Sequence, residues 1–295
     1  MKKRYAFAIV ALLLIGVCAG AASAKTAKEV WADTDKTLDQ MSDIQGLVSV
    51  FTYYPPSIRQ YFPDLDVELK DNKVGWRYQI FQYTWKKPRL IHIEFKYARN
   101  IGKDIVGKML ESKPGTRLVF GYKDTENIYA KFPPTGDKSI DKQIDRQIFF
   151  IPFNTKEYAA AIMSGLNFSG TIAGIMDTRK HYFTDGKVAV AESKSRPMKI
   201  DFKFDTAPQF TRKDVKGDYY VLTLTPNNMA KNQGIEKEIV YINKKTDLPE
   251  QIEVYHKGIL CACFMIDDVK FNQKLDTSLW DSFYKNAHII KNTGK

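Results

Sequence analysis

The sequence has little of what enzymes and metal proteins need. Its four histidines, His92, His181, His256 and His288, are far apart and form neither an H-x₃-H nor an HExxH spacing. It contains no G-x-S-x-G nucleophile elbow, no phosphate-binding loop and no dinucleotide fingerprint. These absences favour a protein that is not an enzyme and that uses no metal and no cofactor.

Cysteine is scarce as well, with Cys18, Cys261 and Cys263 as its three occurrences. On a strand, Cys261 and Cys263 would point to the same face about 6.5–7 Å apart, which is beyond ordinary disulfide reach. A C-x-C pair can also be a redox or metal element, but two thiols without further ligands make a poor site. Buried small apolar side chains are the favoured interpretation.

No hydrophobic run is long enough to anchor the chain, since a membrane-spanning helix needs about 20 apolar residues. Residues 6–17 form a shorter apolar stretch after the basic residues 2–4, and a small-x-small pattern ends at Ala24. This predicts a signal peptide over 1–24, cleaved after Ala24, and a periplasmic location. Lipid anchoring at Cys18 is the alternative, disfavoured by the branched Val17 before it.

Charge of one sign does not gather in the exported part of the chain, although the net charge of the whole sequence is +11. The scattered Lys and Arg residues are typical of a solvated surface. They would also favour contact with an anionic membrane surface. Nucleic acid is not an expected partner of an exported protein.

The last sixty residues contain closely spaced apolar runs of strand length. The expected strands are 236–243, 251–255, 259–266 and 269–272. The short turns between them leave no room for crossover helices, so the strands must form an antiparallel meander. Residues 239–242 and 260–266 are apolar on both faces, whereas an antiparallel sheet normally offers one face to water. The sheet therefore needs a cover on each side.

The rest of the chain predicts further strands and a few helices. One helix is expected over 26–44, stopped by Gly46, and another from Asn154 to Gly165 with a weaker continuation to Asp177. Residues 133–146 are expected to be an exposed loop. In 76–85 the apolar positions change face near Phe81, as in a bulged strand. The remaining expected strands are 47–54, 76–85, 90–97, 117–122, 127–132, 181–184, 187–192, 198–205 and 219–225.

This order of elements predicts an α+β fold. We expect a large curved antiparallel β-sheet, as an unclosed or half β-barrel, covered by two or three helices in one domain over 25–295. So few helices cover only part of such a sheet. Either loops complete an ordinary two-sided core, or an apolar cavity remains for a guest. The candidate cavity-lining residues are the strand aromatics Trp76, Tyr78, Phe95, Tyr122, Tyr129, Phe202 and Tyr220.

The chain resembles the periplasmic outer-membrane lipoprotein carriers, the LolA-like lipoprotein-sorting superfamily. The resembling segments are a basic-Pro-x-Leu strand entry at 86–91, a hairpin over 118–133, and closing strands at 248–255 and 268–280. The resemblance implies a half-barrel lidded by helices over a cavity that takes up lipoprotein acyl chains. Related members sense envelope stress instead. Segments 54–72, 98–116 and 139–180 are longer than in the carriers, whose functional arginine matches no position here.

We therefore expect a periplasmic, non-enzymatic binding or carrier protein for lipid-like or lipoprotein acyl cargo. The alternative is an envelope regulatory or scaffolding protein that senses a ligand or lipoprotein with the same fold, without transport. The expected partners are lipid or lipoprotein acyl chains and envelope proteins.

Overall fold

A computed structural model describes the chain in eleven stretches, which are residues 24–53, 55–59, 76–88, 90–101, 115–120, 127–134, 136–144, 147–152, 172–198, 213–285 and 287–291. The strands are β1 Asp43–Tyr53, β2 Trp76–Lys86, β3 Leu90–Ile101, β4 Arg117–Phe120, β5 Asn127–Lys131, β6 Gln147–Pro152, β7 Gly186–Met198, β8 Lys213–Pro226, β9 Lys237–Asn243, β10 Leu248–His256, β11 Ile259–Phe271 and β12 His288–Lys291. The helices are α2 Ala27–Gln40, α3 Pro56–Arg59, α6 Lys138–Ile144, α8 Ile172–Asp177, α9 Tyr182–Asp185 and α10 Ser278–Tyr284.

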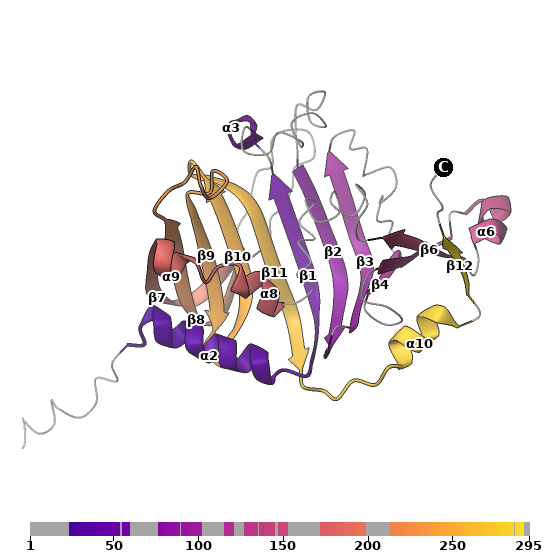
Figure 1. Cartoon of the computed structure of the whole chain (residues 1–295), viewed down its shortest axis with the longest axis horizontal. Coiled ribbons are helices and arrows are strands. Elements are labelled where there is room, and N and C mark those ends of the chain that lie inside the picture. Colours follow the sequence, from indigo (N-terminus) through magenta and orange to yellow (C-terminus); the bar gives the residue numbers. More distant parts are fainter. Residues whose placement is uncertain are drawn as a thin grey trace, which may run out of the picture.

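All twelve strands belong to one open sheet, in the order β12-β6-β5-β4-β3-β2-β1-β11-β10-β9-β8-β7 (Figure 1). The neighbours are antiparallel except β12 and β6, which run parallel. Strands β12 and β7 form the two edges, so the sheet does not close into a barrel. The predicted fold class, a large unclosed sheet with a few helices, is confirmed.

The predicted C-terminal meander is confirmed in β9, β10 and β11. Ile252 of β10 lies opposite Val240 of β9 and Phe264 of β11. The β10–β11 connection is a tight turn in which both Lys257 and Gly258 have positive φ, at 47° and 76°. Such a turn favours glycine, which pays no steric penalty there.

Helix α2 begins with a capping box and ends four residues earlier than predicted. The Thr26 side chain accepts a hydrogen bond from the Glu29 backbone N–H, and the Glu29 carboxylate accepts one from the Thr26 N–H. The helix ends at Gln40 because β1 begins at Asp43. Ile44 is therefore a strand residue, paired with Trp85 and with Phe271.

Gly46 does not stop the helix but lies within β1. The pairing of β1 with β11 is irregular between Gln45 and Leu47. A Cβ at Gly46 would lie 2.7 Å from Ile266 Cγ1 and 3.0 Å from the Asp267 carbonyl oxygen. Glycine is needed here because β11 approaches too closely for a side chain.

Three short helices replace elements that the sequence predicted differently. Residues 182–185 form α9 and not the expected strand. The alternation of apolar and polar residues is weak over these four positions, and a helical turn forms in which the Asp185 N–H donates to the His181 carbonyl oxygen. Helix α6 lies inside the expected loop, where the Asp137 carboxylate accepts the N–H groups of Ser139 and Ile140. Helix α10 replaces the expected closing strand at 275–280.

Strand β2 confirms the predicted change of face. The strand is continuous, and its pairing with β3 is irregular between Ile80 and Phe81. Tyr78 packs with one apolar cluster, and Phe81 belongs to another on the opposite side. The predicted hairpin of 117–122 and 127–132 is present as β4 and β5.

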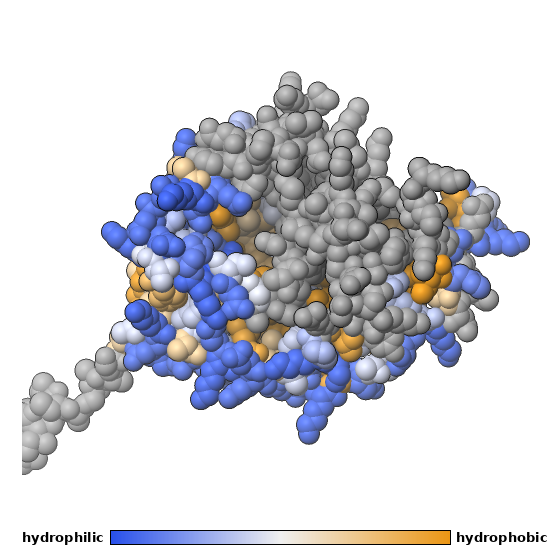
Figure 2. All heavy atoms as spheres, viewed as in Figure 1, coloured by the Kyte–Doolittle hydropathy of each residue, from blue (hydrophilic) through white to orange (hydrophobic). Residues whose placement is uncertain are grey.

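Both faces of the sheet carry buried apolar clusters, as predicted. We call the side covered by α2, α8 and α9 the helix face; its cluster includes Val50, Phe81, Phe95, Leu222, Val240 and Ile252. The other side, the outer face, has one cluster around Phe51, Tyr255, Cys263 and Met265, and another in which α10 covers Val119, Tyr129 and Ile148. The visible described surface is mostly hydrophilic, with smaller hydrophobic areas (Figure 2). None of the described helices is long and apolar enough to cross a membrane.

Candidate functional site

Residues 172–185, which contain α8 and α9, form a segment that packs on the helix face. We call it the covering segment. Its side chains Ile172, Met176 and Tyr182 are 4 %, 0 % and 0 % exposed and share a cluster with Leu222 and Val240 of the sheet. The segment lies in front of the β7–β11 half of the sheet and above α2 (Figure 1).

A buried ion pair fastens this segment to β9. Arg179 Nε donates to Glu238 Oε2 at 2.6 Å, and Arg179 Nη2 lies 2.6 Å from the same oxygen. The two side chains are 15 % and 6 % exposed. Arg179 Nη1 also donates to the Ile175 carbonyl oxygen at 2.6 Å, which fixes the guanidinium against the preceding helix, α8. At this burial the pair is weakly screened by solvent.

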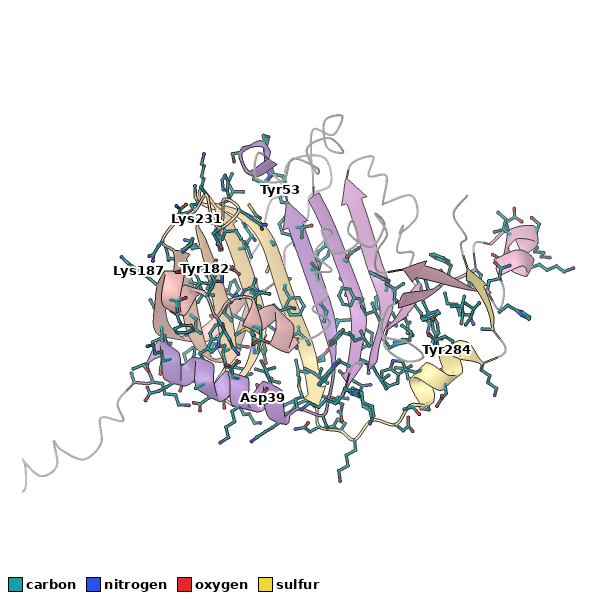
Figure 3. The ribbon with its side chains drawn as sticks, viewed as in Figure 1. Asp39, Tyr53, Tyr182, Lys187, Lys231 and Tyr284 are labelled. Carbon is teal, nitrogen blue, oxygen red and sulfur yellow. The ribbon has the colours of Figure 1, made fainter. Side chains whose placement is uncertain are left out.

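Tyr182 adds a second contact to the same carboxylate. Its hydroxyl donates to Glu238 Oε1 at 2.9 Å and accepts from Asn232 Nδ2 at 2.7 Å. Burial, and then the negative charge of Glu238, raise the pKa of Tyr182, so the phenol stays protonated and can donate. Figure 3 shows Tyr182 at α9, in front of the strands. Arg179 and Tyr182 thus hold the covering segment to the sheet through one residue, Glu238.

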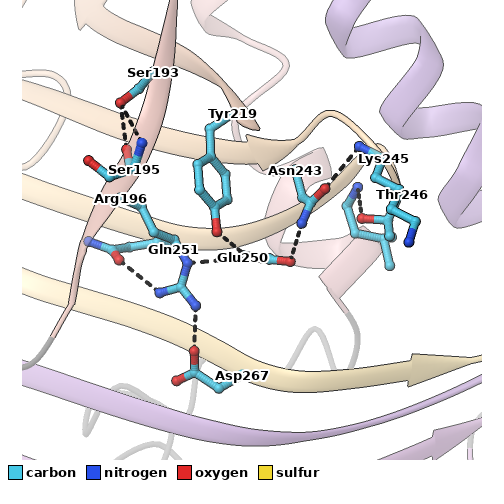
Figure 4. Close-up of polar contacts among 11 residues, drawn as sticks. Ser193, Ser195, Arg196, Tyr219, Asn243, Lys245, Thr246, Glu250, Gln251 and Asp267 are labelled. Atoms are coloured by element: carbon cyan, nitrogen blue, oxygen red, sulfur yellow. Dashed lines mark hydrogen bonds and ion pairs between the residues drawn. The ribbon is translucent and has the colours of Figure 1, made fainter. Parts of the chain in front are cut away.

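The outer face has a separate polar network around Arg196 of β7 (Figure 4). Arg196, 2 % exposed, donates from Nε to Glu250 at 3.2 Å and from Nη1 to Gln251 at 3.2 Å, and its Nη2 pairs with Asp267. The Glu250 carboxylate also accepts from the Tyr219 hydroxyl and from Asn243 Nδ2. The end of β7 is thereby fixed across β10 and β11, which is a structural role.

The buried His256 has a structural role in the described part of the chain. His256 is fully buried; its ring nitrogens lie 2.6 Å from the Gly234 carbonyl oxygen and 3.0 Å from Ser57 Oγ, which ties α3 to the end of β10. In the described part of the chain, no three His, Cys, Asp or Glu side chains are placed to hold a metal ion. Cys261 and Cys263 are buried thiols, and burial raises the pKa of Cys261 to about 12. The interpretation of these cysteines as buried small side chains is confirmed.

The predicted lining residues fall on both sides of the sheet. Phe95 and Tyr220 lie on the helix face, and Tyr78 and Tyr129 lie in the two outer clusters. Trp76 is the first residue of β2, and its side chain lies outside the described part of the structure. Tyr122 and Phe202 also lie outside the described residues. The lining role of all seven stays a prediction.

Sequence reasoning missed the pairing of Arg179 with Glu238. The two residues are 59 positions apart, and each follows other charged residues in a hydrophilic context. Glu238 does break the apolar pattern of β9 on its buried side, and this is the signal that could have identified it. An inward-facing carboxylate on a buried strand requires a cation or a set of donors.

No protein-family model and no curated protein matches the sequence significantly. Solved structures do match. An uncharacterised conserved protein from Thermus thermophilus aligns with 90 % of this chain and 98 % of its own, at 11 % identity and a TM-score of 0.40. A LolA superfamily protein from Nitrosomonas europaea aligns with 87 % of this chain and 97 % of its own, at 13 % identity and a TM-score of 0.29. The structure of the Pseudomonas aeruginosa MucA/MucB complex aligns with 84 % of this chain and 58 % of its own, at 8 % sequence identity and a TM-score of 0.34.

LolA-superfamily structures are thus among the matches, as the sequence resemblance predicts. At these identities and TM-scores the matches assign no function.

Proposed function

We propose that the chain is a periplasmic, non-enzymatic binding or carrier protein for lipid-like guests, including lipoprotein acyl chains. We also propose that residues 25–295 form one domain that is exported by a signal peptide cleaved after Ala24. The observation that carries the binding role is the breadth of the helix face. Its apolar cluster extends, in sheet order, from β5 to β7, while α2, α8 and α9 are the described helices that contribute to it.

The mechanism is transfer by differential burial. Burying a methylene group is favourable by about 0.8 kcal/mol, so a sixteen-carbon chain gains on the order of 10 kcal/mol when it leaves water. That is enough to hold an acyl chain in transit. Release requires a partner that offers the chain a better apolar site, and access requires the covering segment to move away from β9.

The test is native mass spectrometry of the protein purified from its own periplasm, followed by lipid extraction and fatty-acid analysis. We expect recovery of the protein with a bound acyl lipid, displaced by added long-chain fatty acid. The double variant Arg179→Met with Glu238→Gln, which removes both charges of the ion pair between the covering segment and β9, is expected to exchange its lipid faster. Lys194→Met, which breaks the exposed pair with Asp218, is the control and should exchange as the wild type does.

Repeated recovery of empty protein that also fails to bind added acyl lipid would contradict the proposal. That result would favour the alternative, an envelope regulatory or scaffolding protein with a filled interior. A cross-linked envelope protein recovered with the empty chain would support that alternative.

A further inference from the structure

Several buried side chains of the helix face have a polar atom without a hydrogen-bond partner: the indole N–H groups of Trp31 and Trp85, and one oxygen each of Thr52 and Gln79. Thr52 and Gln79 are 5 % and 3 % exposed. Neither Thr52 Oγ1 nor Gln79 Oε1 forms a hydrogen bond with any residue that the structure describes. Buried polar atoms are hydrogen-bonded in the great majority of cases, so an orphaned pair points to a missing partner.

The register of β1 and β2 brings these two side chains together. Gln79 lies opposite Val50, and Thr52 is two residues beyond Val50 on the same face. They are therefore diagonal neighbours, about 7–8 Å apart by ordinary sheet geometry. Val50 belongs to the helix-face cluster, so both side chains point to the side that the proposed guest would occupy.

The helix face changes character along these two strands. From Val50 toward the start of β1, at the α2 end, it is apolar. Thr52 and Gln79 lie toward the opposite end of the paired strands, where β1 ends at Tyr53. Figure 3 shows Tyr53 at that end. The apolar residues of this stretch are Ile44, Val48, Phe81, Tyr83 and Trp85. A long apolar floor with a polar end matches an amphiphile more closely than a pure hydrocarbon.

We propose that Thr52 and Gln79 bind the head of an acyl guest whose chain is joined through a secondary amide. The inference rests on the proposed function and names its ligand class. Gln79 Oε1 accepts the amide N–H, and the Thr52 hydroxyl donates to the amide carbonyl. The acyl chain then runs along the apolar floor toward Trp85. An ester offers the carbonyl but no N–H, and it leaves Gln79 Oε1 buried without a donor.

A matched pair of probes tests this directly. N-Ethyldodecanamide and ethyl dodecanoate differ only in N–H against O, and each would compete with a dansylated undecanoic acid for the full mature chain. We expect the wild type to bind the amide about tenfold more tightly, the size of one hydrogen bond to a group that otherwise stays unpaired. Gln79→Leu is expected to bind both probes equally, with its affinity for the ester retained. Thr52→Val, which keeps the side-chain shape, should weaken the binding of both probes because each offers a carbonyl to the Thr52 hydroxyl, so the test survives if Gln79→Leu does not fold.

Gln40→Leu is the control variant, because Gln40 is exposed at the end of α2 and the substitution is chemically the same. It should keep the tenfold preference. Equal binding of the two probes by the wild type would overturn the inference while leaving the carrier role intact; ordered water would then account for the orphaned atoms. A preference that survives Gln79→Leu would overturn it too. Displacement of the dansyl probe by neither compound would refute the carrier role and the inference with it.

The amide can come from an N-acylated protein terminus or from a free N-acyl amino acid. N-Dodecanoylglycine and an N-dodecanoylated hexapeptide beginning with glycine separate these sources. Tighter binding of the peptide identifies a protein terminus, and equal binding identifies the free lipid. Both results support the amide head.

Discussion

Replacing Arg179 by methionine tests whether one ion pair holds the covering segment against the sheet. Methionine keeps much of the apolar stem of arginine, so packing changes little while the charge and its donors are lost. Glu238, 6 % exposed, would then keep only the Tyr182 hydroxyl as a donor among the contacts described above.

The cost follows from this burial. Removing one partner of a buried ion pair leaves the other charge uncompensated, which typically costs about 3–5 kcal/mol. Neutralising both partners, as in Arg179→Met with Glu238→Gln, removes that uncompensated charge and keeps an oxygen that accepts from Tyr182. We expect the double variant to be less destabilised than Arg179→Met alone, with a coupling of about 2 kcal/mol or more.

Hydrogen exchange of the amides in residues 172–185 is the assay, supported by urea unfolding of the whole chain. Opening of the covering segment should become roughly a hundred to several thousand times more frequent in Arg179→Met, since each 1.36 kcal/mol is a factor of ten. Lys194→Met, which breaks a pair whose side chains are 90 % and 57 % exposed, is the matched control and should leave exchange in this segment unchanged. A loss of stability below about 0.5 kcal/mol for Arg179→Met would refute the idea that this ion pair holds the covering segment, because the pair would then behave like a surface salt bridge.

Two further predictions concern stability. Burial, and then the nearby Arg117, lower the pKa of His92 from 6.5 to about 4. Between pH 6.5 and pH 4, His92 is therefore protonated in the unfolded chain but neutral in the folded chain. The free energy of unfolding falls by about 3 kcal/mol over this range. His92→Gln should flatten this part of the pH profile of urea unfolding; an unchanged profile would show that His92 is not the responsible group. Gly46→Ala should destabilise by about 1–3 kcal/mol, because its Cβ would lie 2.7 Å from Ile266 Cγ1. Ile266→Ala should partly relieve the clash, so strictly additive losses would argue against this contact.

The sheet could be predicted because its strands carry strong local patterns. The runs at 76–85, 90–97 and 251–255 alternate or are continuously apolar, and short turns fix their antiparallel pairing. The errors fall where the local signal is weak. The apolar periodicity of α2 continues into Ile44, so nothing local indicates that β11 and β2 take this residue into a strand.

The candidate site was beyond sequence reasoning because it depends on contacts between distant segments. Arg179 and Glu238 are brought together only when α8 and α9 pack on β9, and Arg196 reaches Glu250 and Asp267 only through the fold of the β7 edge. Thr52 and Gln79 look like ordinary polar strand residues. Their meaning depends on the β1–β2 register, which decides the face they share.

The two sides of the sheet are held by different arrangements of polar contacts, and under the proposed function this difference favours opening on the helix face. On the outer face, Arg196 divides its contacts among Glu250, Gln251 and Asp267, so the loss of one acceptor leaves two in place. On the helix face, Arg179 and Tyr182 both end on Glu238. One change at that carboxylate weakens both contacts together, so the helix face is the side on which a small perturbation, from a partner or from an arriving guest, can release a whole segment.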